Sequence, residues 1–240
     1  MGKNKSNGEK SIVHLALILD GNRRWAMQNK LAIFSGHEKG AEVLNNIVDF
    51  CLKEKIKFLT IYALSSKNIK SRSKEEIAFH FSLHKKYLQR ELDSGKYKKQ
   101  GIRFNALGRI QSLPKDEQDV LKEAMKKSKN FNSLIFSTCI AYDGQEEIVD
   151  AVKNIISKKM PVESINEDLI KKNLYTAEIP PPDLIIRTGM FPEQRLSGFL
   201  LWDSSYSELH FTKTLWPDFT IEELGSILNN YLKRERRNGG

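Results

Sequence analysis

The chain has 240 residues, of which 40% are hydrophobic and 29% are charged, a composition typical of one soluble globular domain. It carries 39 Lys and Arg against 30 Asp and Glu, a net charge of +9, which favours anionic partners such as phosphorylated substrates, anionic lipid or nucleic acid. No apolar run approaches the roughly 20 residues of a membrane span. The Lys-rich start has no apolar core of a secretory signal. We therefore expect a cytoplasmic protein, with a disordered tail over residues 1–11 and one domain over residues 12–240.

Strand-like and helix-like segments alternate along the chain. Strands are expected at 13–19, 58–63, 102–107, 134–141 and 184–187, and apolar helical stripes at 43–51, 77–92, 120–125, 148–156 and 221–232. This alternation predicts an α/β fold with a mostly parallel central sheet flanked by helices. Neither an internal repeat nor an interdomain linker interrupts it. Cys51 and Cys139 both fall in apolar patterns, which predicts buried free thiols.

Side chains that bind anions or metals follow three of the expected strands, where open α/β sheets bind ligands. They are Asp20, Asn22, Arg23 and Arg24 after the first strand, Ser65, Ser66 and Asn68 after the second, and Arg187, Arg195 and Ser197 after the strand at 184–187. A carboxylate can hold a divalent cation, and guanidinium groups and helix N-termini can hold phosphate oxygens. Together these residues predict a metal–diphosphate site.

Each of these residues also has a purely structural alternative. The alternatives are turn or N-cap roles for Asp20 and Asn22, a cap at Ser65-Ser66 for the helix at 77–92, a turn at Gly36 with His37 on the surface, and a structural ion pair at Arg187. The sequence has no GxxxxGK[ST], GxGxxG, GxSxG or HExxH motif, so the usual nucleotide, hydrolase and zinc-protease sites lack support. What remains is a phosphate site made of arginines and acidic residues.

Several motifs, taken in order, resemble those of the cis-prenyltransferases, the family typified by undecaprenyl diphosphate synthase. They are LDGNRRWA at 19–26, Gly36-His37, YALSS at 62–66 with Asn68, DLIIRTG at 183–189, RLSGFLLW at 195–202, YSEL at 206–209, LWPDF at 215–219 and RRNGG at 236–240. A whole series in the right order is more specific than any single motif. The resemblance identifies residues 12–240 as a catalytic domain of this family.

The resemblance implies a parallel sheet flanked by helices, with a hydrophobic tunnel for a growing chain, usually in a homodimer. It implies that an allylic diphosphate condenses with isopentenyl diphosphate, cis and head-to-tail, to give a polyprenyl diphosphate and pyrophosphate, with Mg²⁺ as cofactor. A polyprenyl product is hydrophobic, so the resemblance also makes peripheral contact of the protein with a membrane plausible. The residues nominated as tunnel lining are Phe79, Phe81, Leu83, Leu88, Leu134 and Phe136.

The resemblance also implies roles for individual residues. Asp20 handles the Mg²⁺–diphosphate with Glu208 as a second metal ligand, while His37, Ser65 and Asn68 assist diphosphate departure or proton removal. The substrate-binding residues are Gly21, Asn22, Arg23, Arg24, Trp25, Arg187, Arg195, Ser197, Arg237 and Gly239. The last two match a motif that reaches the neighbouring subunit's active site. Cations and backbone N–H groups suit this chemistry because departing pyrophosphate gains negative charge.

The sequence departs from the family pattern around the second substrate. Lys67, Ile69 and Ser71 stand where the family has an acidic, an aromatic and an arginine residue, and Arg72 comes one position late. Two residues are inserted after Gly189, within the stretch 190–192. These departures keep a head-to-middle coupling with branched products open as an alternative.

Two further alternatives belong to different functional classes. A non-catalytic subunit of a heteromer would have no need of Asp20, Arg187 or Glu208. A nucleic-acid-binding protein would interleave basic and aromatic residues on an exposed surface, whereas here arginines are set beside acidic residues. We expect no nucleic-acid partner.

Overall fold

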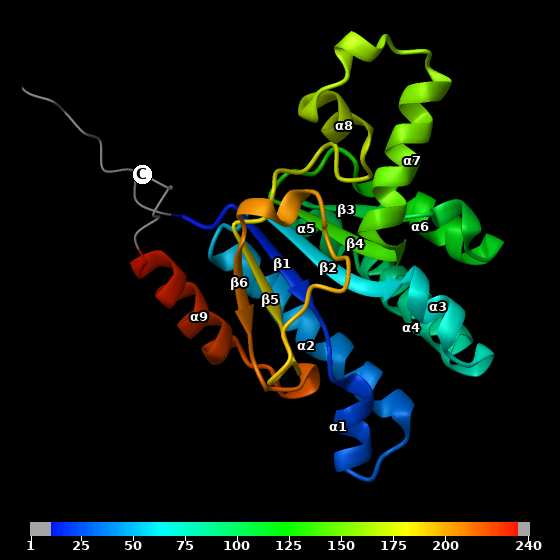
Figure 1. Ribbon diagram of the computed structural model, residues 1–240. Coiled ribbons are helices and arrows are strands. Elements are labelled where there is room, and N and C mark those ends of the chain that lie inside the picture. Colours follow the sequence, from blue (N-terminus) through cyan, green and yellow to red (C-terminus); the bar gives the residue numbers. More distant parts are fainter. Residues whose placement is uncertain (1–10, 235–240) are drawn as a thin grey trace, which may run out of the picture.

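The computed structural model describes residues 11–234. A six-stranded sheet lies at its centre, in the order β3-β4-β2-β1-β5-β6, with every neighbouring pair parallel (Figure 1). The strands are β1 (His14–Ile18), β2 (Phe58–Ser65), β3 (Ile102–Leu107), β4 (Leu134–Tyr142), β5 (Leu184–Arg187) and β6 (Glu208–Phe211). The tail expected over residues 1–11 lies, except for Ser11, outside the described residues.

Four of the five expected strands, β1, β2, β4 and β5, form on largely apolar runs, whereas β3 at the edge of the sheet includes the polar residues Arg103 and Asn105. All five residues of β1 and all nine of β4 are buried, as parallel strands covered on both faces require. The sixth strand, β6, was not predicted. It has four residues, ELHF, which are only partly buried at the edge of the sheet, so its sequence carries little strand signal.

Helices fill the connections between the strands. They are α1 (Asn22–Gln28), α2 (Ile33–Lys53), α3 (Ser66–Ser71), α4 (Lys74–Asp93), α5 (Lys96–Gln100), α6 (Lys115–Ser128), α7 (Gly144–Ser157), α8 (Glu167–Asn173) and α9 (Ile221–Lys233), with short 3₁₀ turns η1 (Ile110–Ser112), η2 (Val162–Ser164), η3 (Asp203–Tyr206) and η4 (Trp216–Asp218). The five expected apolar stripes lie in α2, α4, α6, α7 and α9. Helices α3, α5 and α8, which have five to seven residues, are too short to show a stripe.

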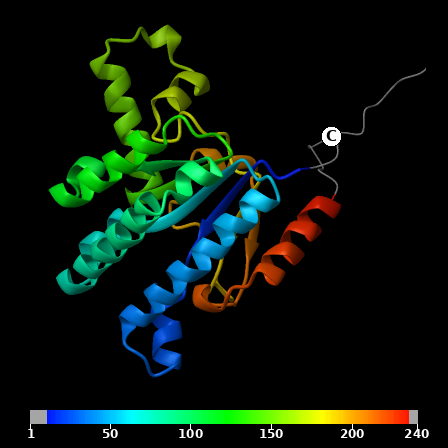
Figure 2. The same cartoon turned by 180° about the vertical axis from the view of Figure 1, so that it is seen from behind.

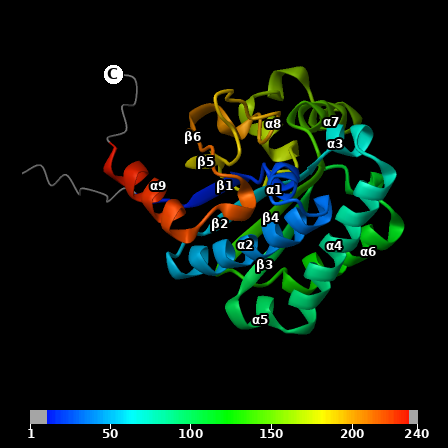
Figure 3. The same ribbon diagram turned by 90° about the horizontal axis from the view of Figure 1, so that it is seen from below.

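The sheet is covered on both faces. Helices α2, α4 and α9 lie over one face (Figure 2), and α7 and α8 lie on the other side of the sheet from α2 and α4 (Figure 3). The larger core, on the α2–α4 side, includes Leu15 and Leu17 of β1. The alternate residues Ala16 and Ile18 face the second, smaller core, because successive side chains of a strand point to opposite faces.

The cysteines and the helices can be compared with what the sequence predicts about thiol burial and membrane spans. Cys51 and Cys139 are buried free thiols, as expected. Among residues 11–234, none of the helices is long and apolar enough to cross a membrane.

His14 of β1 is fully buried and ties the start of the sheet to a distant loop. Its Nδ1 lies 2.7 Å from the carbonyl oxygen of Pro180, and its Nε2 lies 2.8 Å from Oγ1 of Thr60. A carbonyl oxygen only accepts, so Nδ1–H donates to Pro180 and Nε2 accepts from the Thr60 hydroxyl. Burial lowers the pKa of His14 to about 4, because the charged imidazolium is poorly solvated there.

Acidification is therefore expected to destabilise the fold partly through His14. In the unfolded chain this group takes up a proton near its ordinary pKa of about 6.5, whereas in the folded chain it resists protonation until about pH 4. Its contribution is thus complete above pH 6.5 and is lost as the pH falls, by about 2 kcal/mol between pH 7.5 and pH 5. Urea unfolding of the wild type and of His14→Leu at both pH values measures this. The variant should lose less stability on acidification, and equal losses would contradict the assignment.

Candidate active site

The residues after β1 are fixed in place by backbone contacts at the carboxyl edge of the sheet. The backbone oxygen of Asp20 accepts hydrogen bonds from the amide of Trp216 at 3.0 Å and the hydroxyl of Thr188 at 2.8 Å. Gly21 then adopts a φ of 117° as the N-cap of α1, a conformation that favours glycine. The chain therefore turns sharply after Asp20 and leaves its carboxylate at the edge.

The Asp20 carboxylate lies between two arginines. Its Oδ2 accepts from Nη2 of Arg187 at 2.8 Å, and its Oδ1 accepts from Nη2 of Arg24 at 3.1 Å. Arg24 also donates to the carbonyl oxygen of Gly189 at 2.5 Å. The structure thus brings the first and the last strand-end motifs together, as the sequence predicted.

Arg187 is buried and makes further contacts with the loop after β5. Its Nη1 donates to the carbonyl oxygen of Arg195 at 2.6 Å and to Oγ of Ser197 at 2.8 Å. The Arg195 side chain itself is exposed. Arg187 does form an ion pair, as the structural alternative expected. Its partner is Asp20, which belongs to the candidate site.

Ser65 and Asn68 meet at the end of β2. Ser65 is the N-cap of α3, because its Oγ accepts from the backbone N–H of Asn68 at 3.0 Å. The alternative that this serine pair caps the helix at 77–92 is wrong, since Ser73 caps α4 instead by accepting from the amide of Glu76. Ser65 and Asn68 both line the main cavity.

His37 lies inside α2, one turn after the helix begins, and is buried. The alternative of a turn at Gly36 and a surface His37 is therefore wrong. A Cβ on Gly36 would lie 2.1 Å from the backbone oxygen of Asn22, so glycine allows α1 and α2 to approach closely. Burial, with help from the guanidinium groups of Arg72 and Arg23, lowers the pKa of His37 to about 4, so its imidazole is neutral at pH 7.

One expected metal ligand, Glu208, lies at the opposite edge of the sheet from Asp20. Glu208 pairs with Leu184, the first residue of β5. Ile18 of β1 pairs with Arg187, the last residue of β5, and Asp20 comes two positions after Ile18. Within one subunit, Asp20 and Glu208 therefore cannot share a metal ion, which corrects the expected ligand pair. Arg237 and Gly239 fall outside the described residues.

Arg23 and Trp25 are placed beside the site by contacts with other elements. Nη1 of Arg23 lies 3.6 Å from a carboxylate oxygen of Glu76. The indole N–H of Trp25 donates to Asp218 at 2.6 Å, and Trp25 is not among the residues that line the cavity. We infer that Trp25 anchors α1 to the η4 turn.

A cavity of about 390 Å³ runs from this polar edge into the space between the sheet and helices α2 and α4. Four of the nominated residues line it, namely Phe81, Leu83, Leu88 and Phe136. Phe79 instead packs on Phe34, with ring centroids 4.2 Å apart, and Leu134 is fully buried in the core. The nomination was therefore right for four residues and wrong for two.

The mouth of the cavity is suited to an anion. Four guanidinium groups, those of Arg23, Arg24, Arg72 and Arg187, gather there around the carboxylates of Asp20 and Glu76. Four buried polar atoms at the mouth make no hydrogen bond among the described residues: Asn22 Oδ1, His37 Nε2, Glu76 Oε1 and Arg187 Nε. Buried polar atoms are rarely left unpaired, so these are positioned to contact a ligand.

Glu76 and His80 were not predicted from the sequence. Both lie on α4, one turn apart, and face His37 across the mouth. Their i, i+4 spacing shows that the two side chains share one face of a helix. The sequence does not show that this face lies opposite His37, because that depends on how α2 packs against α4.

The family model described as "Putative undecaprenyl diphosphate synthase", a prenyltransferase family, matches residues 18–239. The chain belongs to this family. It is 40% identical over 230 residues, 94% of this chain and 86% of the relative, to a tritrans,polycis-undecaprenyl-diphosphate synthase (geranylgeranyl-diphosphate specific) of Pyrococcus abyssi. It is 41% identical to an isoprenyl transferase of Thermotoga maritima, covering 95% of this chain and 96% of the relative.

A solved structure agrees with this membership. The crystal structure of lavandulyl diphosphate synthase from Lavandula x intermedia in complex with dimethylallyl diphosphate matches with a TM-score of 0.89 and 34% identity, over 94% of this chain and 97% of that one. This prenyltransferase therefore has the fold that the motif series implied. It is a transferase of prenyl groups.

Proposed function

We propose that this prenyltransferase condenses an allylic diphosphate with isopentenyl diphosphate, cis and head-to-tail, and releases pyrophosphate to give a polyprenyl diphosphate. The observation that carries the proposal is one cavity with an arginine-rich mouth and an apolar interior. Such a cavity is complementary to a molecule with an anionic head and a hydrocarbon tail.

The reaction breaks the bond between C1 of the allylic substrate and its diphosphate, joins that carbon to the double bond of isopentenyl diphosphate, and removes one proton. Arg24 and Arg187, both held by Asp20, are placed to stabilise charge that gathers on the leaving oxygens. We assign Arg23, Arg24 and Asn22 to the allylic diphosphate, and Arg187, Arg195 and Ser197 to isopentenyl diphosphate.

Three polar residues are assigned to help the diphosphate leave or to help remove the proton. His37 presents a neutral, unpartnered Nε2 to the cavity, so it can accept a proton or a hydrogen bond. Ser65 and Asn68 line the same wall, and their backbone contact holds them together.

We also propose that Mg²⁺ binds at Asp20. Mg²⁺ is commonly held by one or two carboxylates together with substrate phosphates, and Asp20 offers oxygen ligands beside the unpartnered Oδ1 of Asn22. When bound, the ion would neutralise charge on the departing diphosphate. Glu208 is left out of this ligand set because it lies at the other end of the sheet.

Assembly as a homodimer and peripheral membrane contact remain proposals. Val149, Val152 and Ile156 form an exposed apolar row on α7, a helix that projects from the sheet in Figure 1. Exposed apolar patches commonly mark interaction sites, and a second copy would cover this one.

The alternatives have weaker support. Head-to-middle coupling is not favoured, because the curated relatives at about 40% identity carry names for undecaprenyl diphosphate synthase and isoprenyl transferase. A non-catalytic subunit does not explain the contact between Asp20 and Arg187. A nucleic-acid-binding protein does not explain the apolar cavity.

Product analysis tests the proposal. The purified protein is incubated with Mg²⁺, isopentenyl diphosphate and allylic diphosphates of increasing length, and products are analysed by mass spectrometry and NMR. We expect linear products with new cis double bonds and release of pyrophosphate. A branched product from dimethylallyl diphosphate alone would contradict head-to-tail coupling, and the absence of any product would contradict the proposed reaction.

Product length should depend on the apolar wall of the cavity. Ala63 of β2 lines it, so Ala63→Leu is expected to fill part of the tunnel and shorten the products by one or more five-carbon units. Ala78→Leu, on the exposed face of α4, is the matched control and should leave product length unchanged. Chromatography of the dephosphorylated products measures the effect. Unchanged products from Ala63→Leu would show that the growing chain does not pass this wall.

A further inference from the structure

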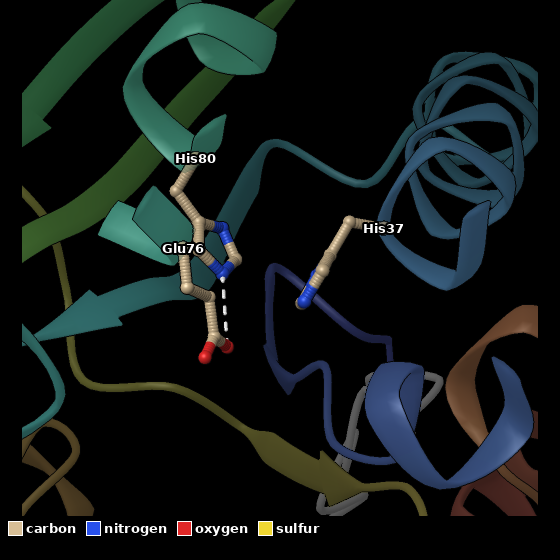
Figure 4. A group of neighbouring side chains, drawn as sticks. All are labelled: His37, Glu76 and His80. Atoms are coloured by element: carbon tan, nitrogen blue, oxygen red, sulfur yellow. Dashed lines mark ion pairs between the residues drawn. The ribbon is translucent and has the colours of Figure 1, made fainter. Parts of the chain in front are cut away.

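Three potential metal ligands gather on one side of the cavity mouth. His37 comes from α2, and Glu76 and His80 come from α4, with one ligand atom of each within 4.8 Å of the others. Figure 4 shows the three side chains extending from two different helices into the same space. The two imidazole rings meet edge to face, with centroids 4.1 Å apart.

Two of these side chains are buried with unsatisfied polar atoms. His37 and Glu76 are each only 8% exposed. Nε2 of His37 has no hydrogen-bond partner within the part of the chain that the structure describes, and Oε1 of Glu76 makes an ion pair with Arg72 at 3.2 Å but no hydrogen bond there. A buried polar atom without a partner is costly, and a metal ion bound here would satisfy Nε2 of His37 and take the place of Arg72 at Glu76.

We propose that His37, Glu76 and His80 form a binding site for a divalent transition-metal ion of the Zn²⁺ or Co²⁺ class. Two imidazoles and one carboxylate suit these ions, whereas Mg²⁺ takes an all-oxygen ligand set. Three protein ligands leave a fourth position open to water or a phosphate oxygen. The site is thus separate in chemistry and ligands from the proposed Mg²⁺ position at Asp20.

The three ligand side chains themselves need only small movements to bind one metal ion, since their ligand atoms lie within 4.8 Å of one another. Zn²⁺ with bonds of about 2.0 to 2.1 Å needs ligand atoms about 3.3 Å apart in a tetrahedron. His80 Nε2 and Glu76 Oε1 lie 3.9 Å apart, one turn apart on the same helix. Nε2 of His80 accepts a hydrogen bond from Arg72 at 2.6 Å, and Nε2 of His37 has no partner among the described residues, so both atoms are able to bind a metal ion once Arg72 moves away.

Arg72 already supplies a cation to this cluster. Its Nη1 lies 2.6 Å from Nε2 of His80 and 3.2 Å from Oε1 of Glu76. A bound metal ion has to displace this guanidinium, because both would contact the same two atoms. Arg72 follows the last residue of α3. Because its guanidinium competes with the metal ion, replacing Arg72 with alanine is expected to strengthen metal binding.

The test is direct metal binding by the full-length protein, free of Mg²⁺ and substrate. Zn²⁺ affinity is measured by competition with a chromophoric chelator, and the coordination of Co²⁺ by its visible absorption. We expect one tightly bound ion per chain, with affinity lowered about tenfold or more in Glu76→Gln and His80→Leu. Arg72→Ala should bind several-fold more tightly, and His210→Ala, on β6, is the matched control with unchanged affinity.

The variants distinguish metal binding at this cluster from misfolding and from binding elsewhere on the chain. A gain of affinity in an Arg72→Ala variant whose circular dichroism matches the wild type cannot come from misfolding, and Glu76→Gln preserves the shape of the side chain. Wild-type affinity in both Glu76→Gln and His80→Leu would overturn the proposal, as would unchanged or weaker binding in Arg72→Ala. Because the measurement is binding, its result does not depend on whether the proposed prenyl transfer is correct.

Discussion

Replacing Asp20 with alanine is expected to lower kcat/KM for prenyl transfer by about 10³-fold or more. The carboxylate holds Arg187 and Arg24 in place, at 2.8 and 3.1 Å, and is the proposed ligand for Mg²⁺. Its loss removes both functions at the point where the diphosphate departs. Steady-state rates over a range of Mg²⁺ concentrations measure the effect.

Asp20→Asn separates charge from shape. It keeps the size of the side chain but loses the charge, so we expect it to be nearly as inactive as the alanine variant. Asp119→Asn, on the exposed surface of α6 where the carboxylate pairs with Lys115, is the control and should keep wild-type activity. The role given to Asp20 is wrong if Asp20→Asn stays within tenfold of the wild type while circular dichroism shows both variants folded.

The sheet was predictable wherever a strand carries an apolar run or an alternation of apolar and polar residues. Strands β3 and β5 occupy the residues expected for them, and β1, β2 and β4 differ from expectation by one or two residues at their ends. The runs of Ile, Leu and Phe in β1, β2, β4 and β5 are what a strand covered on both faces requires, and β3 at the edge alternates apolar and polar residues over Ile102–Asn105. The edge strand β6 escaped prediction because a partly exposed four-residue strand needs neither a continuous apolar run nor a strict alternation.

The site was predictable where it lies at strand ends, because parallel strands bring their carboxyl ends to one edge. Asp20 and Arg187 meet there although 167 residues separate them. The motif order alone could not place Glu208, since the register of β6 against β5 puts that residue at the opposite edge. Register depends on pairing between whole strands, which no local pattern in ELHF specifies.

Contacts that depend on helix packing could not be predicted from the sequence either. The N-cap role of Ser65 follows from α3, a helix of six residues with no apolar stripe. The cluster of His37, Glu76 and His80 forms because α2 approaches α4, and the close passage of α1 over Gly36 fixes one end of α2. Helix-to-helix distances of this kind are set by side-chain packing across the core.

The second large effect is expected at Arg187. One guanidinium there contacts Asp20, Ser197 and the backbone of Arg195, and lysine cannot reproduce this fork with a single nitrogen. We expect Arg187→Lys to lower kcat/KM by about 10² to 10³-fold, with a raised KM for isopentenyl diphosphate, because the loop at 190–198 loses its anchor. Arg103→Lys, which pairs with Glu178 away from the cavity, is the matched control.

A double-mutant cycle decides whether Arg187 acts through Asp20 or independently. If the two side chains work as one unit, Arg187→Ala costs much less activity in the Asp20→Ala background than in the wild type, because the ion pair is already broken. Additive losses would mean that each residue contacts the substrates separately, and that the 2.8 Å contact between them is only structural. A rise in KM for isopentenyl diphosphate that persists in both backgrounds would assign the anchoring of the 190–198 loop to Arg187 alone.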